Sequence, residues 1–134
     1  MTHLLDSSAW LVHLFGEPGV DEVSLLFDDP NTQVSISALS IPEVFARLKA
    51  IGRAAAWAEV WAIYSELFSG VLAADEGIAH QAVQLRAATP ERLPTVDGLI
   101  AATALARRLT LVHRDPHMAA IADPELRQMQ LPDR

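Results

Sequence analysis

The feature that most restricts the fold is the alternation of short apolar segments with longer stretches of helical periodicity. The segments that are too short for a helix and favour a strand are Leu4–Leu5, Gln33–Ser37, Val71–Leu72, Thr110–Val112 and Gln128–Leu131. Helical patterns stand between them, so the strands should pair in parallel through right-handed crossovers. We therefore expect an α/β fold, a three-layer α/β/α sandwich with a central parallel sheet of four to five strands.

Length and composition fit one globular domain. The chain has 134 residues, of which 51% are apolar, enough for a full core in a single domain spanning residues 1–134. The absence of cysteine excludes a disulfide scaffold, a thiolate zinc site and a cysteine nucleophile. No apolar run reaches the roughly 18 residues of a membrane span, and the start of the chain lacks the basic cluster of a secretory signal. We expect a soluble cytoplasmic protein without membrane association.

The charge balance is acidic. A formal net charge of -7 argues against broad electrostatic attraction to nucleic acid, although it does not exclude an enzyme that acts on one. All basic residues except Lys49 are arginines, the side chain that binds phosphate in a bidentate way.

A set of acidic residues stands where a predicted strand or loop gives way to a predicted helix: Asp6, Glu43, Asp97 and Asp115. Asp6 and Asp115 follow buried strands. Glu43 completes a capping box with Ser40. Asp97 lies in the turn that Thr95 is predicted to cap, ahead of a helix over residues 96–109. Taken alone, each acid has an ordinary structural role as a helix cap or a first-turn carboxylate.

Taken together, the acids indicate a metal site. The carboxyl ends of parallel strands meet at one edge of a sheet, where ligands bind. Clustered carboxylates repel one another and raise each other's pKa, and a bound cation removes that penalty. A set of oxygen ligands without cysteine favours a hard ion, Mg²⁺ or Mn²⁺. We therefore expect the four acids to converge around such an ion, which can activate a water molecule as nucleophile.

The sequence also resembles a known family. The segments that carry the resemblance read, in order, Leu-Leu-Asp-Ser-Ser, Ser-Ala-Leu-Ser-Ile-Pro-Glu-Val-Phe-Ala-Arg-Leu, Asp-Gly-Leu-Ile-Ala-Ala-Thr-Ala-Leu-Ala and Leu-Val-His-Arg-Asp-Pro-His-Met. They are similar to PIN-domain ribonucleases, and most of all to the VapC toxins of prokaryotic toxin–antitoxin pairs. The similarity covers nearly the whole chain, and its most specific part is the segment 97–106.

The resemblance implies Mg²⁺- or Mn²⁺-dependent hydrolysis of RNA phosphodiesters. In that interpretation Asp6 and Asp97 are the central metal ligands, and Asp115 and Glu43 complete the cage or hold water. Ser7, or its neighbour Ser8, matches a hydroxyl position that supports the first aspartate. Arg114 is expected either to hold a substrate phosphate or to pair with one of the acids.

The sequence departs from the family pattern at two places. His113 stands where a threonine or serine is common before the Arg-Asp pair. A further acid that some relatives carry just past Asp115 has no counterpart, which leaves one-metal chemistry open. A two-histidine metal site from His113 and His117 is conceivable, but the spacing across Pro116 does not give one clean helix face.

The segment around residues 53–68 predicts a long helix with an aromatic face formed by Trp57, Trp61, Tyr64 and Phe68. Such a face is more often core or interface than a stacking platform for bases. The resemblance implies that this region, residues 47–68 with Trp10 nearby, helps to form a groove for an antitoxin helix. It also implies that the domains pair as homodimers.

Two other functions share part of this sequence pattern with an RNase toxin. A PIN-like domain with weak catalysis would act as a binding module through complex formation. A phospho-receiver domain also gathers acids around Mg²⁺, but that fold requires adjacent early acids and a lysine at the last strand. The only lysine here, Lys49, falls on a predicted helix.

Overall fold

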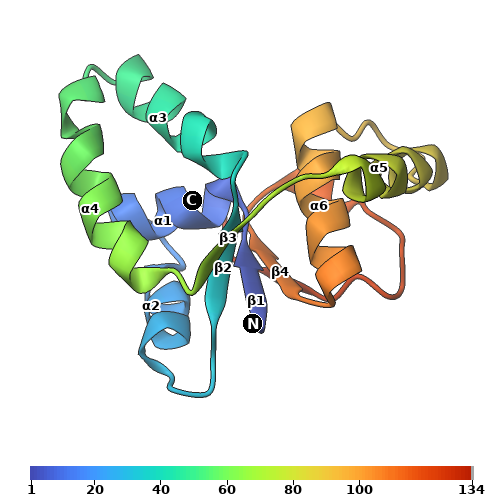
Figure 1. Cartoon of the computed structure of the whole chain (residues 1–134), viewed down its shortest axis with the longest axis horizontal. Helices are drawn as coiled ribbons and strands as arrows, with labels where there is room; N and C mark the ends of the chain where they lie inside the picture. Colours follow the sequence, from blue (N-terminus) through green and yellow to red (C-terminus); the bar gives the residue numbers. More distant parts are fainter. Residues whose placement is uncertain (134) are drawn as a thin grey trace.

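The computed structural model describes residues 1–133 and contains a five-stranded, fully parallel sheet in the order β3-β2-β1-β4-β5 (Figure 1). The strands are β1 His3–Leu5, β2 Val34–Ser37, β3 Gly70–Leu72, β4 Thr110–His113 and β5 Gln128–Gln130. The predicted parallel α/β sheet is confirmed. This strand order differs from the 2-1-3-4-5 order of receiver-type folds, which argues against the phospho-receiver alternative.

Helices cover both faces of the sheet (Figure 1). On one face lie α1 Ser7–Phe15, α2 Val20–Asp28, α3 Ser40–Ala50, a 3₁₀ turn Ala54–Ala56 and α4 Trp57–Leu67. On the other face lie α5 Glu76–Ala88, α6 Thr95–Arg107 and the short α7 Pro116–Ala119. The arrangement is the expected three-layer sandwich.

Alternate residues of the central strands supply two separate cores. Leu5 and Val112 pack with Trp10 on the α1 side, whereas Leu4 and Leu111 pack on the α6 side. All are fully buried. Successive side chains of a strand point to opposite faces, so a continuous apolar run is what a sheet covered on both sides requires.

The predicted helix over residues 53–68 is divided into the 3₁₀ turn and α4. Its aromatic face packs against Trp10, whose ring lies 5.1–6.3 Å from the ring centres of Trp57, Trp61, Tyr64 and Phe68. Trp10 is 0% exposed. The aromatic face is therefore mainly core, in agreement with the more ordinary of the two interpretations.

Two predicted helix caps are wrong. Leu39, not Ser40, is the residue that precedes α3, and it makes no side-chain cap. Pro94 precedes α6, so Thr95 lies inside the first turn instead of capping it. Ser40 is fully buried, and its hydroxyl is 2.9 Å from that of Ser7, so a distant contact replaces the local cap.

Within residues 1–133, no helix has the length and apolar character needed to cross a membrane.

Candidate acidic active site

Strand register places the acids at one edge of the sheet. Leu5 pairs with Ile36 on one side and with Val112 on the other, so the residues that follow these strands lie side by side. Asp6 follows β1 directly, and its backbone N–H donates to the carbonyl of Val112 at 2.9 Å. Asp115 comes two residues after β4. The two acids are therefore brought together by the central strand pair.

The carboxylate of Asp6 is buried, and only one of its two oxygens accepts hydrogen bonds from the described residues. Asp6 is 3% exposed, and its Oδ2 accepts from the hydroxyl of Ser8 at 2.6 Å and from the Ser8 backbone N–H at 3.2 Å. These bonds make Asp6 the N-cap of α1, as its local sequence predicts. The other oxygen, Oδ1, is buried and has no hydrogen-bond partner among the described residues. A buried carboxylate oxygen without a partner is energetically costly, and this oxygen can accept a ligand.

The four acids influence one another electrostatically. Burial raises the pKa of Asp6 to about 6, and the charges of Asp115 and Glu43 add to the rise. The pKa of Asp97 is raised to about 7 by burial and by the charges of Asp115, Asp6 and Glu43. A side-chain hydrogen bond with Asp115 raises it further. The structure thus gathers all four predicted acids into one cluster.

Glu43 is held by serines. The Ser7 hydroxyl lies 2.5 Å from Glu43 Oε1 and 2.9 Å from the Ser40 hydroxyl. Since Glu43 can only accept while ionised, Ser7 donates to it and in turn accepts from Ser40. The sequence offers Ser7 or Ser8 as the support for the first aspartate; in the structure Ser8 has that role, and Ser7 contacts Glu43 instead. Ser40 was missed because its helix-start pattern suggested a cap.

Asp115 is fixed at its side chain and at its backbone. Its Oδ1 accepts from the backbone N–H of His117 at 2.8 Å, which makes it the predicted N-cap of α7. Its own N–H donates to Nδ1 of His113 at 3.1 Å. Both ring nitrogens of His113 are engaged, since Nε2 lies 2.8 Å from Oε1 of Gln128. Neither nitrogen is therefore free to bind a metal in this arrangement.

Arg114 pairs with an acid outside the cluster. Its Nη2 lies 2.8 Å from Oε1 of Glu17, and its side chain is 9% exposed. Glu17 follows the carboxyl end of α1, whereas Asp6 precedes the first residue of that helix. The nine residues of α1 span roughly 13 Å, so the guanidinium is directed away from Asp6. Pairing with an acid was one of the two roles expected for Arg114, but the partner is not one of the four.

Asp97 is positioned by the loop before α6. The Nε of Arg86 in α5 donates to the carbonyl of Leu93 at 2.8 Å, and its alkyl chain crosses α6 at Gly98. A Cβ at Gly98 would lie 3.2 Å from two carbons of Arg86, closer than ordinary packing allows. The glycine beside Asp97 therefore makes room for the side chain that fixes the incoming loop.

The acids are not yet in a metal-ligating arrangement. Within residues 1–133, no group of three or more acidic or histidine side chains is placed so that it could hold an ion. Asp97 is hydrogen-bonded to Asp115, and Glu43 is hydrogen-bonded to Ser7. The donor set nevertheless consists of carboxylate oxygens, the ligands that Mg²⁺ and Mn²⁺ prefer. Together with the unpartnered Oδ1 of Asp6, it fits such an ion.

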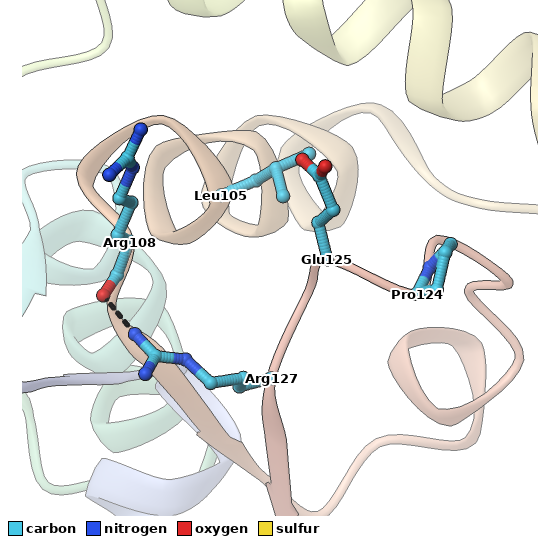
Figure 2. Close-up of a pocket in the computed structure, with 5 residues that line it drawn as sticks. All are labelled: Leu105, Arg108, Pro124, Glu125 and Arg127. Atoms are coloured by element: carbon cyan, nitrogen blue, oxygen red, sulfur yellow. Dashed lines mark hydrogen bonds between the residues drawn. The ribbon is translucent and has the colours of Figure 1, made fainter.

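A hollow of about 460 Å³ lies elsewhere in the molecule, and none of the four acids lines it. Figure 2 shows its walls, which come from the end of α6 and the segment before β5: Leu105, Arg108, Pro124, Glu125 and Arg127. Arg127 donates to the backbone carbonyl of Arg108 across it. The hollow therefore belongs to the amino ends of β4 and β5, the opposite edge from the acids.

The residues predicted to bind a partner differ in exposure. Trp10 and Tyr64 are buried, and the Tyr64 hydroxyl lies 2.6 Å from Nδ1 of His13. Trp57 and Trp61 are half-buried and stack at 6.0 Å. On the same helix Ile63 is 53% exposed. Of these four aromatic side chains, Trp57 and Trp61 keep the larger exposed surface, and Trp10 packs against both.

Comparison with known proteins identifies the family. A model described as "PIN domain" matches residues 3–124. The search of curated proteins finds no match.

Several solved structures share the fold. VapBC2 from Rickettsia felis, bound to a promoter DNA fragment, has a TM-score of 0.79 at 18% identity, covering 98% of this chain and 100% of the other. A toxin–antitoxin complex from Klebsiella pneumoniae has a TM-score of 0.68 at 25% identity, covering 93% and 95%. VapC20 of Mycobacterium tuberculosis, described as a toxin that cleaves the sarcin-ricin loop, has a TM-score of 0.72 at 17% identity, covering 94% and 99%.

Proposed function

Because the chain belongs to the PIN domain family, we propose that it is a metal-dependent endoribonuclease, the toxin of a toxin–antitoxin pair. The observation that carries the proposal is Oδ1 of Asp6, a buried oxygen without a hydrogen-bond partner among residues 1–133, within a cluster of four acids. The structural neighbours support it, since they include VapBC complexes and a VapC described as a sarcin-ricin loop cleaving toxin.

Asp6, Asp97 and Asp115 would hold the ion, Mg²⁺ or Mn²⁺, and Glu43 would complete the site or hold water. When bound, the ion lowers the pKa of water and offsets negative charge on the phosphoryl oxygens. In the proposed reaction, water attacks phosphorus, the bond to the 3′ oxygen breaks, and that oxygen takes a proton. The products carry 5′-phosphate and 3′-hydroxyl ends.

The chain's own contribution is orientation. Ser8 holds Asp6 by one oxygen and leaves the other free to bind. The Ser7 hydroxyl fixes Glu43, and the backbone of His117 fixes Asp115. Groups that orient metal ligands in this way are part of the preorganisation that a protein contributes to phosphoryl transfer.

An antitoxin is the proposed protein partner. The surface of α4 carries the half-buried Trp57 and Trp61 one turn apart, which suits the apolar face of a helix. Solved neighbours such as VapBC from Salmonella typhimurium and FitAcB from Neisseria gonorrhoeae share the fold, with TM-scores of 0.78 and 0.75. A homodimer is proposed on the family resemblance. The alternative function, a weakly catalytic binding module, would use the same surface to bind a partner and would not depend on catalysis by the acidic site.

The test compares Asp6→Asn and Asp97→Asn with Asp75→Asn as matched control. Asp75 also caps a helix after a strand, α5 after β3, and its Oδ1 accepts from the Ile78 N–H of that helix at 3.0 Å. We expect RNA cleavage with Mn²⁺ to fall on the order of 100-fold or more in the first two variants and to persist in the control. Cleavage that survives both substitutions would remove the metal-centred mechanism. A wild-type protein that never cleaves but binds an antitoxin would favour the binding module.

A further inference from the structure

We infer that His113 is a positioning residue that couples the last strand, β5, to Asp115 in the acidic cluster. The inference rests on the proposed function in so far as Asp115 is taken as a metal ligand. It concerns a histidine that stands where the family pattern has a threonine or serine. Its partner Gln128 lies beyond residues 3–124, the part that matches the family model.

The hydrogen bonds of His113 define one tautomer. Its Nδ1 accepts the backbone N–H of Asp115 at 3.1 Å, so this nitrogen carries no proton. The proton is therefore on Nε2, which donates to Oε1 of Gln128 at 2.8 Å. The imidazole thus connects the two residues through opposite edges of its ring. A threonine side chain is too short to make both contacts.

The surroundings make this bridge rigid. His113 is 0% exposed, and its carbonyl accepts the N–H of Leu131 at 2.8 Å. His113 also pairs with Gln130 in the register of β4 and β5. Backbone and side-chain bonds thus tie the same residue to the last strand. A displacement of β5 would be transmitted to the backbone of Asp115, and through it to a carboxylate of the cluster.

Two substitutions separate the two halves of the bridge. In His113→Asn, the Oδ1 takes the place of Nδ1 and can accept from Asp115, but nothing reaches Gln128. In His113→Gln, the Nε2 takes the place of the ring Nε2 and can donate to Gln128, but the Asp115 N–H loses its acceptor. Gln128→Leu cuts the outer contact alone and is the matched control for His113→Asn.

The readouts are Mn²⁺ affinity, measured by calorimetry without RNA, and the thermal midpoint of the metal-free chain. We expect His113→Asn to keep the Mn²⁺ affinity within about two-fold and to lower the midpoint as Gln128→Leu does. We expect His113→Gln to lose about ten-fold or more in Mn²⁺ affinity while it keeps the higher midpoint, because groups that orient metal ligands have effects of this size. If His113 had only a structural role, the variants would rank in the same order by Mn²⁺ affinity as by thermal midpoint. That result would overturn the inference.

Nuclear magnetic resonance of the metal-free chain decides the inference independently of metal binding. The wild-type imidazole should show a protonated Nε2 and an unprotonated Nδ1. The Asp115 amide should exchange slowly with solvent in wild type and His113→Asn, and faster in His113→Gln. If wild type shows this pattern but binds no Mn²⁺, the proposed function fails while the positioning role stands. A protonated Nδ1, or equal Asp115 exchange in the two histidine variants, would refute the positioning role.

Discussion

The hydroxyl of Ser8 donates to one oxygen of the Asp6 carboxylate at 2.6 Å, and the other oxygen has no partner within residues 1–133. Ser8 also accepts the backbone N–H of Arg114 at 2.9 Å. One hydroxyl therefore links the start of α1 to the chain that leaves β4. The two segments that carry Asp6 and Asp115 are held together by it.

Replacing Ser8 with alanine should affect both stability and metal binding. We expect Ser8→Ala to lower the free energy of unfolding by about 1–3 kcal/mol, because the partly buried Arg114 N–H and the buried Asp6 oxygen each lose a partner. Mn²⁺ affinity should fall as well, since only the Ser8 backbone N–H would still orient the Asp6 carboxylate. Calorimetry and urea unfolding measure the two effects. Ser8→Thr, which keeps the hydroxyl, should behave like wild type, and an equal loss in both variants would contradict this role.

The stability of the metal-free protein should depend on pH through Asp6. Its pKa is raised to about 6 in the folded state, against about 4 in an unfolded chain, so the folded state binds the proton more tightly. This contribution is fully present below pH 4 and is lost as pH rises through 6. We expect the stability of wild type relative to Asp6→Asn to fall by about 3 kcal/mol between pH 4 and pH 8. Urea unfolding at both pH values measures it, and a constant difference would be inconsistent with the raised pKa.

Metal binding should show the opposite pH dependence. An ion competes with protons for the carboxylates, and the pKa of Asp97 is raised to about 7. Mn²⁺ affinity should therefore increase as pH rises through 6 and 7, and should level off above. Calorimetric titration from pH 5 to pH 8.5 tests this. In Asp97→Asn, Mn²⁺ affinity should be lower, and its rise with pH should be centred at a lower pH. If the pH midpoint of that rise did not change, Asp97 would not be a ligand.

Arg114 should matter for stability more than for substrate binding. Its guanidinium is paired with Glu17, and the side chain is 9% exposed. We expect Arg114→Met to destabilise the protein by about 3 kcal/mol, the cost of breaking a largely buried ion pair. The KM for RNA should stay within about two-fold, because the guanidinium does not face the acids. A large rise in KM without loss of stability would instead identify Arg114 as a phosphate ligand.

The aromatic cluster should separate folding from partner binding. Trp10 is 0% exposed and contacts four other rings, so Trp10→Ala should cost about 3–5 kcal/mol. Trp57 is half-buried, so Trp57→Ala should lower the free energy of unfolding by less. Thermal unfolding of the two variants measures the difference. If Trp57→Ala were as destabilising as Trp10→Ala, the exposed part of α4 would be unsuited to a role in binding.

The sequence predicts the parts of this structure that depend on short-range patterns. The corner at Asp6 is one example, because a cap requires only residues 6–8. The gathering of acids also follows from pattern, since parallel strands separated by helices bring their carboxyl ends together. Contacts between distant residues were not predictable. Glu17 pairs with Arg114 over 97 positions, and nothing in either local sequence marks the other.

The wrong cap prediction at Ser40 and the unpredicted contact of Gln128 also result from contacts between residues distant in sequence. Ser40 stands at a helix start with Glu43 three residues later, which is the local signature of a capping box. In the folded chain the Ser7 hydroxyl lies between them, and it contacts both. The tertiary contact overrides the local preference. Gln128 carries no signal of its own, because glutamine side chains are mostly solvated.

The register of the central strands has a consequence for synthesis of the protein. β1, made first, pairs on one side with β4, in which His3 lies opposite Thr110. A nascent chain therefore carries its first strand with one edge unfilled until most of the polypeptide has left the ribosome. The segments that carry Asp97 and Asp115 are likewise made after β1, β2 and β3. If the domain cleaves RNA, a partly synthesised chain that lacks these acids therefore lacks the cleavage site, and the ribosome that makes it is not exposed to the activity at that stage.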